Sequence, residues 1–347
     1  LRAGKYLLAA VQPSAKAMWG IYLVDVYDNM LLLKSEPGWA FFEPVPIVKR
    51  TKPPVIPDRV NLTSKDAVLD IFDIYVGQGL RGVPRGTVKS LRVFSYEYAY
   101  RLAGRSHASI GLEGPWDVHK IHGTVPVNAD GSVRFTVPAN TPISLQPLDA
   151  EGKALQLMRS WLTAMPGEVL TCVGCHEKSN QTPPPRITAA SAKPPLKITP
   201  WRGPARGFSF KREVQPVLDK HCVGCHDGTK RKEGAIPDFS TKTTRGFNGY
   251  TPSYIALHPY VRRNGPEGDY HVLTPLEFHA DTSELMQMLQ QGHHNVRLDA
   301  EAWDRLVTWI DLNVPDHGTW SEFRPVKSNF AKRRREMQLL YASINDD

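Results

Sequence analysis

In the first fifty residues, β-forming apolar side chains either alternate with others or cluster in short runs. Apolar and β-branched residues gather at 6–11, 19–26 and 30–33, and Asp28-Asn29 separates the last two runs. This pattern predicts a small antiparallel sheet. Because so few strands cannot bury a core alone, we expect residues 1–50 to be the end of a β-propeller. Its other blades are absent from this chain or are supplied by the rest of the protein.

Prolines punctuate residues 51–65, which we expect to be a linker, and β-patterning resumes over residues 66–180. Strands are predicted at 68–78, 88–98, 125–127, 133–137, 142–148 and 154–161. The Asp130-Gly131 pair predicts a hairpin between the third and fourth of these runs, and residues 149–153 are expected to join the last two. Short strands at this spacing predict a β-sandwich-like middle domain.

A second Pro-rich stretch, residues 181–207, is expected to be a linker that lies extended over the surface. From residue 208 the apolar positions recur at helical spacing. Asp281 is expected to cap a helix that ends at Gly292, and Asp299 is expected to begin another. His317 is expected at the surface. Helix positions expected to be buried are Val214, Val217, Leu218, Trp303, Leu306, Val307 and Ile310.

The fold class expected is therefore multidomain α+β, with a mainly helical domain over residues 208–320 and a basic tail over 321–347. The chain has 347 residues, a length that suits two or three domains, and its 41% hydrophobic residues are typical of globular proteins. Its formal charge is +8. No run of eighteen apolar residues occurs, so no membrane span is expected. Basic residues are dispersed except at Lys332–Arg335, so nucleic acid is not expected as a partner. The positive excess suits either steering toward an acidic redox partner or simple solubility.

Two copies of one pentapeptide carry the clearest chemistry. Cys172-Val173-Gly174-Cys175-His176 and Cys222-Val223-Gly224-Cys225-His226 both read Cys-x-x-Cys-His, and together they use all four cysteines. This is the attachment signature of a c-type haem. Each thiol pair can add to the vinyl groups of one porphyrin, and the adjoining His can reach the iron. We therefore expect two covalently bound haem c groups, with His176 and His226 as iron ligands.

Zinc and disulfides are the alternative interpretations of the same cysteines. Zinc ribbons space their Cys-x-x-Cys pairs about 15–20 residues apart, whereas a long Pro-rich stretch separates these two. Two disulfides would need no His at a fixed offset. A thioredoxin-like motif would explain one pair but not two identical pairs.

For the second ligand of each iron, the residues offer several candidates. For the second haem the candidates are His293, His294, Met286, Met288, His271 and His279. His293 is favoured, followed by His294, because both follow a helix-ending Gly in a loop that can turn onto an iron. For the first haem the candidates are Met158, Met165, His119 and His122, or an open site. An open haem binds small diatomic molecules, whereas a closed one only passes electrons.

Several segments resemble the hydrazine synthase alpha subunit family. Residues 123–132, 138–142, 158–161, 166–168 and 172–177 resemble its middle domain. Residues 278–285, 292–294 and 309–313 resemble its C-terminal cytochrome domain, and the opening hairpin resembles the end of its N-terminal β-propeller. The resemblance implies bis-His ligation of the second haem. In that family a Tyr four residues after the first motif binds the first haem, and the motif His binds zinc. Asn180 stands at that position here, so we expect family membership without hydrazine synthesis.

The function expected is that of a dihaem c-type cytochrome that transfers electrons within a larger extracytoplasmic redox assembly. Its partners would be redox proteins or other cytochrome subunits. One alternative is a redox enzyme of small nitrogen compounds, with the first haem catalytic and the second feeding it electrons. Another is a structural module in which the haems hold a loop-rich chain together. Covalent haem attachment occurs outside the cytoplasmic membrane and no secretory signal is visible, so a mature or truncated chain is expected.

Overall fold

The chain forms two compact units, Leu1–Asp58 and Arg59–Asp347, in a computed structural model. The structure describes residues 4–49, 51–55, 58–100, 109–229, 236–241, 249–265 and 271–342. The first unit contains the strands β1 (Tyr6–Val11), β2 (Gly20–Asp25) and β3 (Met30–Lys34), paired antiparallel in that order. The three predicted strands are confirmed within one or two residues.

A carboxylate organises the turn between β2 and β3. Asp25 Oδ1 accepts hydrogen bonds from the backbone N–H groups of Tyr27 at 2.9 Å and Asn29 at 3.0 Å. Asp28 takes a left-handed backbone with φ of 66°, which Asp tolerates better than most residues. All of β3 is exposed, including Leu31 and its apolar neighbours. The strands therefore form a sheet with little core of its own, and the assignment to a propeller stays a prediction.

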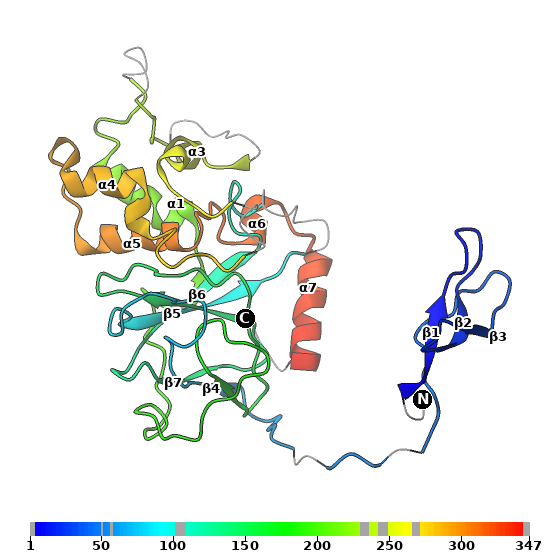
Figure 1. Cartoon of the computed structure of the whole chain (residues 1–347). Coiled ribbons are helices and arrows are strands. Elements are labelled where there is room, and N and C mark those ends of the chain that lie inside the picture. The colour runs from blue at the N-terminus through cyan, green and yellow to red at the C-terminus, as the bar shows by residue number, and fades with distance from the viewer. Residues whose placement is uncertain are drawn as a thin grey trace. The chain divides into compact units, whose positions relative to one another are not determined.

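The second unit contains two sheets that pack on a shared core (Figure 1). The four-stranded sheet has the order β10 (Arg206–Gly207), β6 (Val118–Pro126), β5 (Ser90–Glu97), β8 (Ile143–Leu148). The three-stranded sheet has the order β7 (Val133–Pro138), β4 (Asp66–Ile71), β9 (Val169–Cys172). Strand β4 pairs antiparallel with β7 and parallel with β9. The chain is thus α+β, with its middle region built from sheets.

Strand β5 is buried on both faces. Leu91 and Val93 belong to the core between the two sheets, together with Leu69 of β4 and Phe135 of β7. Phe94 instead belongs to a second core, on the opposite face of the same sheet. Because successive side chains of a strand point to opposite faces, this division explains why β5 is buried almost continuously rather than at alternate positions.

One predicted pairing in the sheets is wrong, and another forms only at its two ends. The runs 125–127 and 133–137 do not form a hairpin, because β6 lies in the four-stranded sheet and β7 in the three-stranded one. The turn with Asp130-Gly131 carries the chain between the sheets. Residues 154–161 form no strand and make only single bridges, Leu148 with Ala154 and Ile143 with Leu162. The run predicted at 68–78 also ends early, since β4 stops at Ile71.

Most of the helices lie over the outer face of the four-stranded sheet, and the last one lies beside the sheets (Figure 1). The helices are α1 (Phe210–Glu213), α2 (Gln215–His221), α3 (Pro252–Leu257), α4 (Glu284–Gln291), α5 (Ala300–Asp311), α6 (Trp320–Phe323) and α7 (Ser328–Met337). Short 3₁₀ turns occur at His258–Tyr260, Ala280–Thr282 and His293–Asn295, and a π turn at Gln338–Ala342 follows α7. Among the residues that the structure describes, no helix is both long and apolar enough to cross a membrane.

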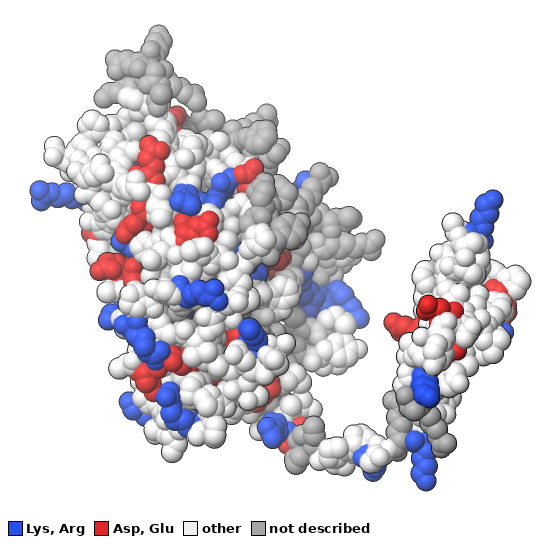
Figure 2. All heavy atoms as spheres, in the orientation of Figure 1, with Lys and Arg blue, Asp and Glu red and all other residues white. Residues whose placement is uncertain are grey.

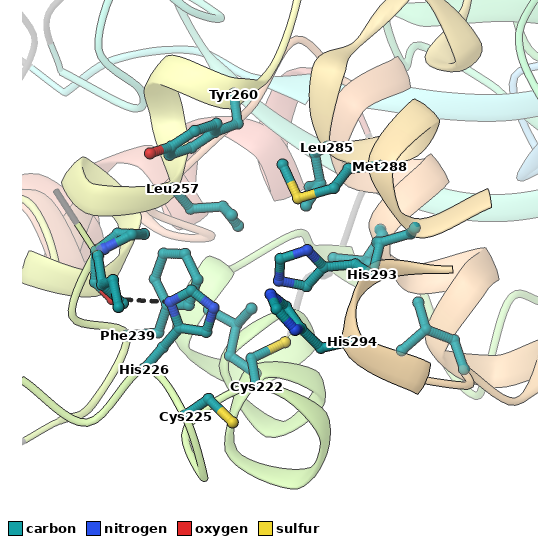
Figure 3. A pocket seen from close by; sticks show the side chains of 16 residues that line it. Cys222, Cys225, His226, Phe239, Leu257, Tyr260, Leu285, Met288, His293 and His294 are labelled. Atoms are coloured by element: carbon teal, nitrogen blue, oxygen red, sulfur yellow. Dashed lines mark hydrogen bonds between the residues drawn. The ribbon is translucent and has the colours of Figure 1, made fainter. Parts of the chain in front are cut away.

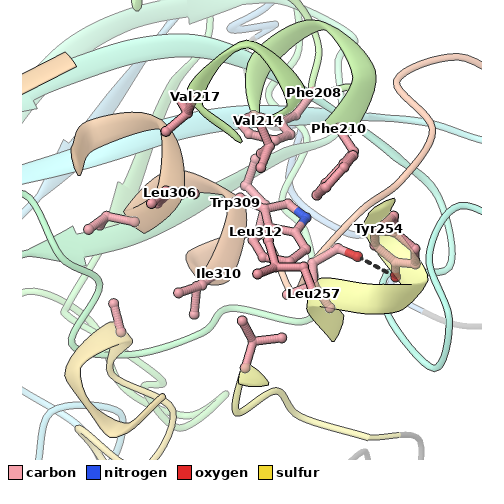
Figure 4. Packing of buried hydrophobic residues seen from close by; sticks show 14 of the residues in the cluster. Phe208, Phe210, Val214, Val217, Tyr254, Leu257, Leu306, Trp309, Ile310 and Leu312 are labelled. Carbon is pink, nitrogen blue, oxygen red and sulfur yellow. Dashed lines mark hydrogen bonds between the residues drawn. The ribbon is translucent and has the colours of Figure 1, made fainter. Parts of the chain in front are cut away.

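Trp309 and Phe210 pack at the centre of the helical core, with ring centres 5.3 Å apart (Figure 4). Tyr254 lies against Phe210, and its hydroxyl donates to Val314 O at 2.9 Å. Phe94 and Ile121 enter this core from the sheet. The helices therefore share one core with the four-stranded sheet and are not packed as a separate body.

The helix ends test the capping predictions. Asp299 precedes α5 and accepts from Ala302 N at 2.8 Å, and Gly292 ends α4 with φ of 91°; both predictions are confirmed. Asp281 is not the cap of α4, because Ser283 occupies that position. The Asp281 carboxylate instead accepts from Lys153 Nζ at 2.7 Å. His317, expected at the surface, is buried, because it stacks on Tyr250 with ring centres 5.9 Å apart.

The second Pro-rich stretch runs extended across both sheets. Leu196 exchanges backbone hydrogen bonds with the β7 region, and Thr199 exchanges two at 2.9 Å with Thr124 of β6.

Basic and acidic side chains are mixed over the face of the larger unit in Figure 2. Helix α7 has no buried residue, and its Arg334 donates to Tyr98 O at 2.7 Å.

Candidate functional site

The second Cys-x-x-Cys-His motif forms a single turn at the end of α2. Cys222 N donates to Leu218 O at 2.8 Å, and the N–H groups of Cys225 and His226 donate to Cys222 O at 3.1 and 3.0 Å. This turn sets Cys222, Cys225 and His226 into the wall of one cavity of about 400 Å³ (Figure 3). Burial raises the pKa of Cys222 to about 11, so its sulfur is a protonated thiol at neutral pH.

The rest of the cavity wall is mainly apolar. Side chains from α2, α3, α4 and α5 line it: Leu218, Leu257, Leu285, Met288, Leu289 and Leu306. In Figure 3, Leu257, Tyr260, Leu285 and Met288 lie around the space that His226 and His293 face. Cofactor pockets are typically apolar clefts of about 300–1,000 Å³ with a few placed polar groups. The cavity fits this description.

His226 is held in one orientation. Its Nδ1 lies 3.0 Å from Pro237 O, and because a carbonyl oxygen only accepts, Nδ1 carries the hydrogen and Nε2 keeps its lone pair. Phe239 stacks on the imidazole with ring centres 4.8 Å apart. A His whose second nitrogen donates to a backbone carbonyl is the usual arrangement at a metal site.

His293 faces His226 across the cavity (Figure 3). Their ring centres are 6.0 Å apart, with an angle of 32° between the ring planes. Metal–imidazole nitrogen bonds are about 2 Å long, so two imidazoles that bind one metal from opposite sides have ring centres about 6 Å apart. The pair therefore leaves space for one iron, and the two Cys of the motif line the same cavity.

Three of the six candidates for the second ligand line this cavity. His293 and His294 lie in the turn after Gly292, with ring centres 4.6 Å apart, and Met288 comes from α4. Met286 is fully buried in the helical core. His279 lies elsewhere, with Nε2 2.9 Å from Asp149 Oδ2. His271 lines the cavity of the first motif instead.

The first motif begins at Cys172, the last residue of β9, and the backbone of residues 72–79 is hydrogen-bonded to it. Phe72 N donates to Cys172 O at 2.9 Å, and Gly79 N donates to Cys175 O at 3.1 Å. A Cβ at Gly79 would lie 2.3 Å from Cys175 Sγ, which is closer than atoms can approach. Cys172, Cys175 and His176 line a cavity of about 670 Å³. The first motif is therefore packed against the sheets, whereas the second lies among helices.

Glu177 fixes the first motif from inside the loop. Its Oε2 accepts hydrogen bonds from the backbone N–H groups of Val173 and Gly174. Burial raises the pKa of Cys172 to about 11, with the Glu177 and Asp70 carboxylates adding to the effect, and burial alone raises that of Cys175 to about 11. His176 is exposed and has a left-handed backbone with φ of 57°. Glu177 thus acts on the loop backbone rather than on the His176 ring.

Met158 and His271 line the first cavity beside the motif. The other predicted candidates do not line it. Met165 is exposed, His122 Nε2 lies 2.7 Å from Ser95 Oγ, and His119 lies on the wall of a different cavity. The sequence offers no local signal for His271, which follows the motif by almost a hundred residues.

A glutamine joins the His271 region to the first motif. Gln156 Nε2 donates to Gly79 O at 2.8 Å and to Leu273 O at 2.7 Å, and Gly79 contacts Cys175. Within the described ranges, no three side chains of His, Cys, Asp and Glu gather in a way that would hold a metal ion by themselves. What the second cavity offers is two facing imidazoles, an arrangement that suits a metal already held in a porphyrin. The assignment of all eight Cys and His side chains as haem-binding stays a prediction.

Comparisons with known proteins address the family. Residues 86–177, which include the first motif, match the family model described as the hydrazine synthase alpha subunit middle domain. The fold matches a solved structure of Kuenenia stuttgartiensis hydrazine synthase with a TM-score of 0.62 at 17% sequence identity. That match covers 89% of this chain and 54% of the other, so the chain spans about half the length of that protein. A comparison with curated protein sequences finds no match. The predicted resemblance is confirmed: residues 86–177 match the middle domain of the hydrazine synthase alpha subunit, and the fold of the chain is similar to that of hydrazine synthase.

Proposed function

We propose that this protein is a dihaem c-type cytochrome that transfers electrons. The observation that carries the proposal is the facing pair His226 and His293, 6.0 Å apart, in an apolar cavity that Cys222 and Cys225 also line. A haem in this cavity would exchange single electrons. The chain's own part is to present Nε2 of His226 through the Pro237 carbonyl, to close the opposite side with His293, and to exclude water with the leucines of the wall.

The proposal extends to the parts of the chain. The sheet domain would hold one haem c through Cys172, Cys175 and His176, and the helical domain would hold the other. The β1–β3 sheet, with its exposed apolar side chains, would be the end of a β-propeller. The matched family model describes part of a subunit, which supports a role within a larger assembly of redox proteins. Its compartment would be extracytoplasmic, where haem is attached covalently.

The test is the mass of the denatured chain, purified from a host that attaches haem c. The expected mass exceeds the polypeptide mass by two haems. The Cys222→Ser/Cys225→Ser variant should lose one haem, and the Cys172→Ser/Cys175→Ser variant should lose the other. A bare polypeptide mass, or zinc in place of iron by elemental analysis, would contradict the proposal.

A second candidate function is a redox enzyme of small nitrogen compounds, with the first site catalytic. The observation that favours it is the first cavity, which at about 670 Å³ is larger than the second at about 400 Å³ and contains the exposed His176. Asn180 argues against this candidate, because it is exposed and stands where the family resemblance implies a Tyr ligand.

Carbon monoxide binding separates the two functions, because it needs an open coordination position on reduced iron. One equivalent bound per chain, lost in the Cys172→Ser/Cys175→Ser variant, would favour the enzyme. No binding would favour a pure electron carrier.

A further inference from the structure

A third cavity contains neither Cys motif. It has a volume of about 470 Å³ and lies beside β5, with walls from the segments 114–119, 157–161 and 311–313. Nothing in the haem proposal uses it. Its volume is within the range of pockets for small organic ligands, about 300–1,000 Å³. We call it the aromatic cavity, after four of its lining residues: Tyr96, Tyr98, Trp116 and Trp161.

Three of these rings form a continuous wall. Tyr96 and Tyr98 are parallel within 3°, with ring centres 6.4 Å apart. Trp161 meets both at steep angles, with ring centres 5.9 Å from Tyr96 and 5.4 Å from Tyr98. Trp161 is 53% exposed, so the wall reaches the solvent. Aromatic faces carry partial negative charge and attract cations, above all quaternary ammonium groups.

A carboxylate with no close counter-charge lies beside this wall. Among the described residues, no basic side chain forms an ion pair with Asp117 within 4.0 Å, and the Arg334 charge acts on it only at longer range. Arg334 itself donates to Tyr98 O and lies 3.9 Å from Glu97. Arg159, also on the cavity wall, donates to His271 O. The cationic side chains nearest the cavity therefore already have partners, whereas the Asp117 carboxylate has a hydrogen bond with the Ala99 backbone but no ion-pair partner among the described residues.

His119, on the wall of the same cavity, has a buried ring nitrogen. Burial lowers the pKa of His119 to about 3, while a hydrogen bond with the Leu312 backbone acts in the opposite direction. The ring is therefore neutral, and its Nδ1 has no partner among the described residues. A carboxylate, a neutral imidazole and an aromatic wall all favour a ligand that is positively charged or donates hydrogen bonds.

We propose that the aromatic cavity binds a small organic cation, a protonated or quaternary amine, with its charge against the Tyr96–Tyr98–Trp161 wall and the Asp117 carboxylate. Leu157, Met158 and Arg159 line both this cavity and that of the first motif. An occupant would therefore lie one layer of side chains from the first motif. The proposal does not depend on which group the motif holds.

The test uses the full holoprotein, with choline as the probe and 3,3-dimethylbutan-1-ol as its uncharged analogue of equal shape. Calorimetry and tryptophan fluorescence should show saturable choline binding at one site per chain. Loss of the charge removes the cation–π and carboxylate interactions, so the alcohol should bind at least about tenfold more weakly. Equal binding of the two probes, or no saturable binding of choline at millimolar concentration, overturns the proposal.

Variants then locate the site. Trp161→Leu and Asp117→Asn should each weaken choline binding about tenfold, and Trp161 is exposed enough for its replacement to leave the fold intact. Trp39→Leu is the matched control, since Trp39 is an exposed tryptophan of the first unit, and it should bind choline as the parent does. Unchanged binding in the Trp161→Leu and Asp117→Asn variants would place the cation elsewhere and overturn the proposal.

Discussion

His226 has its orientation set by groups that bind no iron. The Pro237 carbonyl takes the Nδ1 hydrogen and Phe239 covers one ring face, so little side-chain freedom remains to be lost when a metal binds Nε2. Among the residues that the structure describes, His293 has no such partner, and its position depends on the turn that Gly292 begins. The two imidazoles of the second cavity therefore differ in how firmly they are held.

With the proposed haem in the second cavity, His293→Ala should convert that haem from low spin to high spin. The variant removes the imidazole that faces His226 at 6.0 Å and leaves one axial position for water. Electron paramagnetic resonance and the optical spectrum measure the change, and the first haem should keep its signal. His294→Ala and Met288→Leu are the matched controls, since both side chains line the same cavity. A change of spin state in either control, with His293→Ala silent, would reassign the ligand.

Asp316 makes the stability depend on pH. It is 1% exposed, and its Oδ2 accepts from Thr251 N at 2.8 Å while Oδ1 has no partner among the described residues. Burial raises the pKa of Asp316 to about 6, against the opposing Thr251 hydrogen bonds. The folded state thus binds a proton that the unfolded state releases near pH 4. Its contribution is fully present below about pH 4 and is lost as the pH rises through about 6.

Asp316→Asn should therefore stabilise the protein more at pH 8 than at pH 5, relative to the parent. The difference between the two pH values should be about 1 kcal/mol in the free energy of unfolding. Urea unfolding of both proteins at the two pH values measures it, and the comparison cancels the titration of other groups. A difference that does not change with pH would contradict the buried carboxylate.

The two motifs are identical pentapeptides in different structural surroundings. The space around their glycines differs accordingly. A Cβ at Gly174 would lie 2.2 Å from Val76 O and 2.6 Å from Asp73 O, whereas a Cβ at Gly224 would meet nothing within 4 Å. Gly174→Ala should destabilise the protein by about 1–3 kcal/mol and reduce haem attachment at the first motif. Gly224→Ala is the matched control and should stay within about 0.5 kcal/mol. Thermal unfolding and intact mass measure both, and equal effects would contradict the difference in packing.

The elements show which features can be predicted from sequence. Runs of β-branched and other apolar residues predict β1, β2 and β3, because such side chains favour extended backbone. They do not show that β6 and β7 belong to different sheets, because partners are chosen by contacts far apart in the chain. The same limit applies to the site. The local Gly-His-His context places His293 in the cavity that it lines, and its role as a ligand stays a prediction, whereas His271 lines the first cavity and not the predicted second one. The aromatic cavity was missed because its rings come from separate segments.

In the larger unit, helices and sheets are joined by a buried ion pair. Arg92 of β5 and Asp311 of α5 lie 2.7 Å apart, with side-chain exposures of 3% and 0%. Arg92 also donates to Gln146 of β8 at 2.9 Å and to Thr308 of α5 at 3.1 Å. Residues of α5 also line the second cavity, and residues of β5 line the aromatic cavity. This network therefore joins one wall element of each cavity.

Arg92→Met alone should lower the free energy of unfolding by about 3–5 kcal/mol, because it leaves the Asp311 charge buried without its partner. Asp311→Leu alone should have a similar cost. The double variant should lose less than the sum of the two, with a coupling energy of about 0.5–3 kcal/mol. The exposed pair Lys332 and Glu336, 4.0 Å apart, is the control and should couple by less than about 0.5 kcal/mol.

Amide hydrogen exchange should show which elements lose protection in the Arg92→Met variant. If the pair joins the helices to the sheets, Arg92→Met should lower amide protection in both β5 and α5, because neither keeps its shared core alone. Additive stabilities in the cycle, or a loss of protection confined to β5, would show that the helical region holds to the sheet without this pair. The Phe94 and Ile121 contacts with Trp309 and its neighbours would then be sufficient.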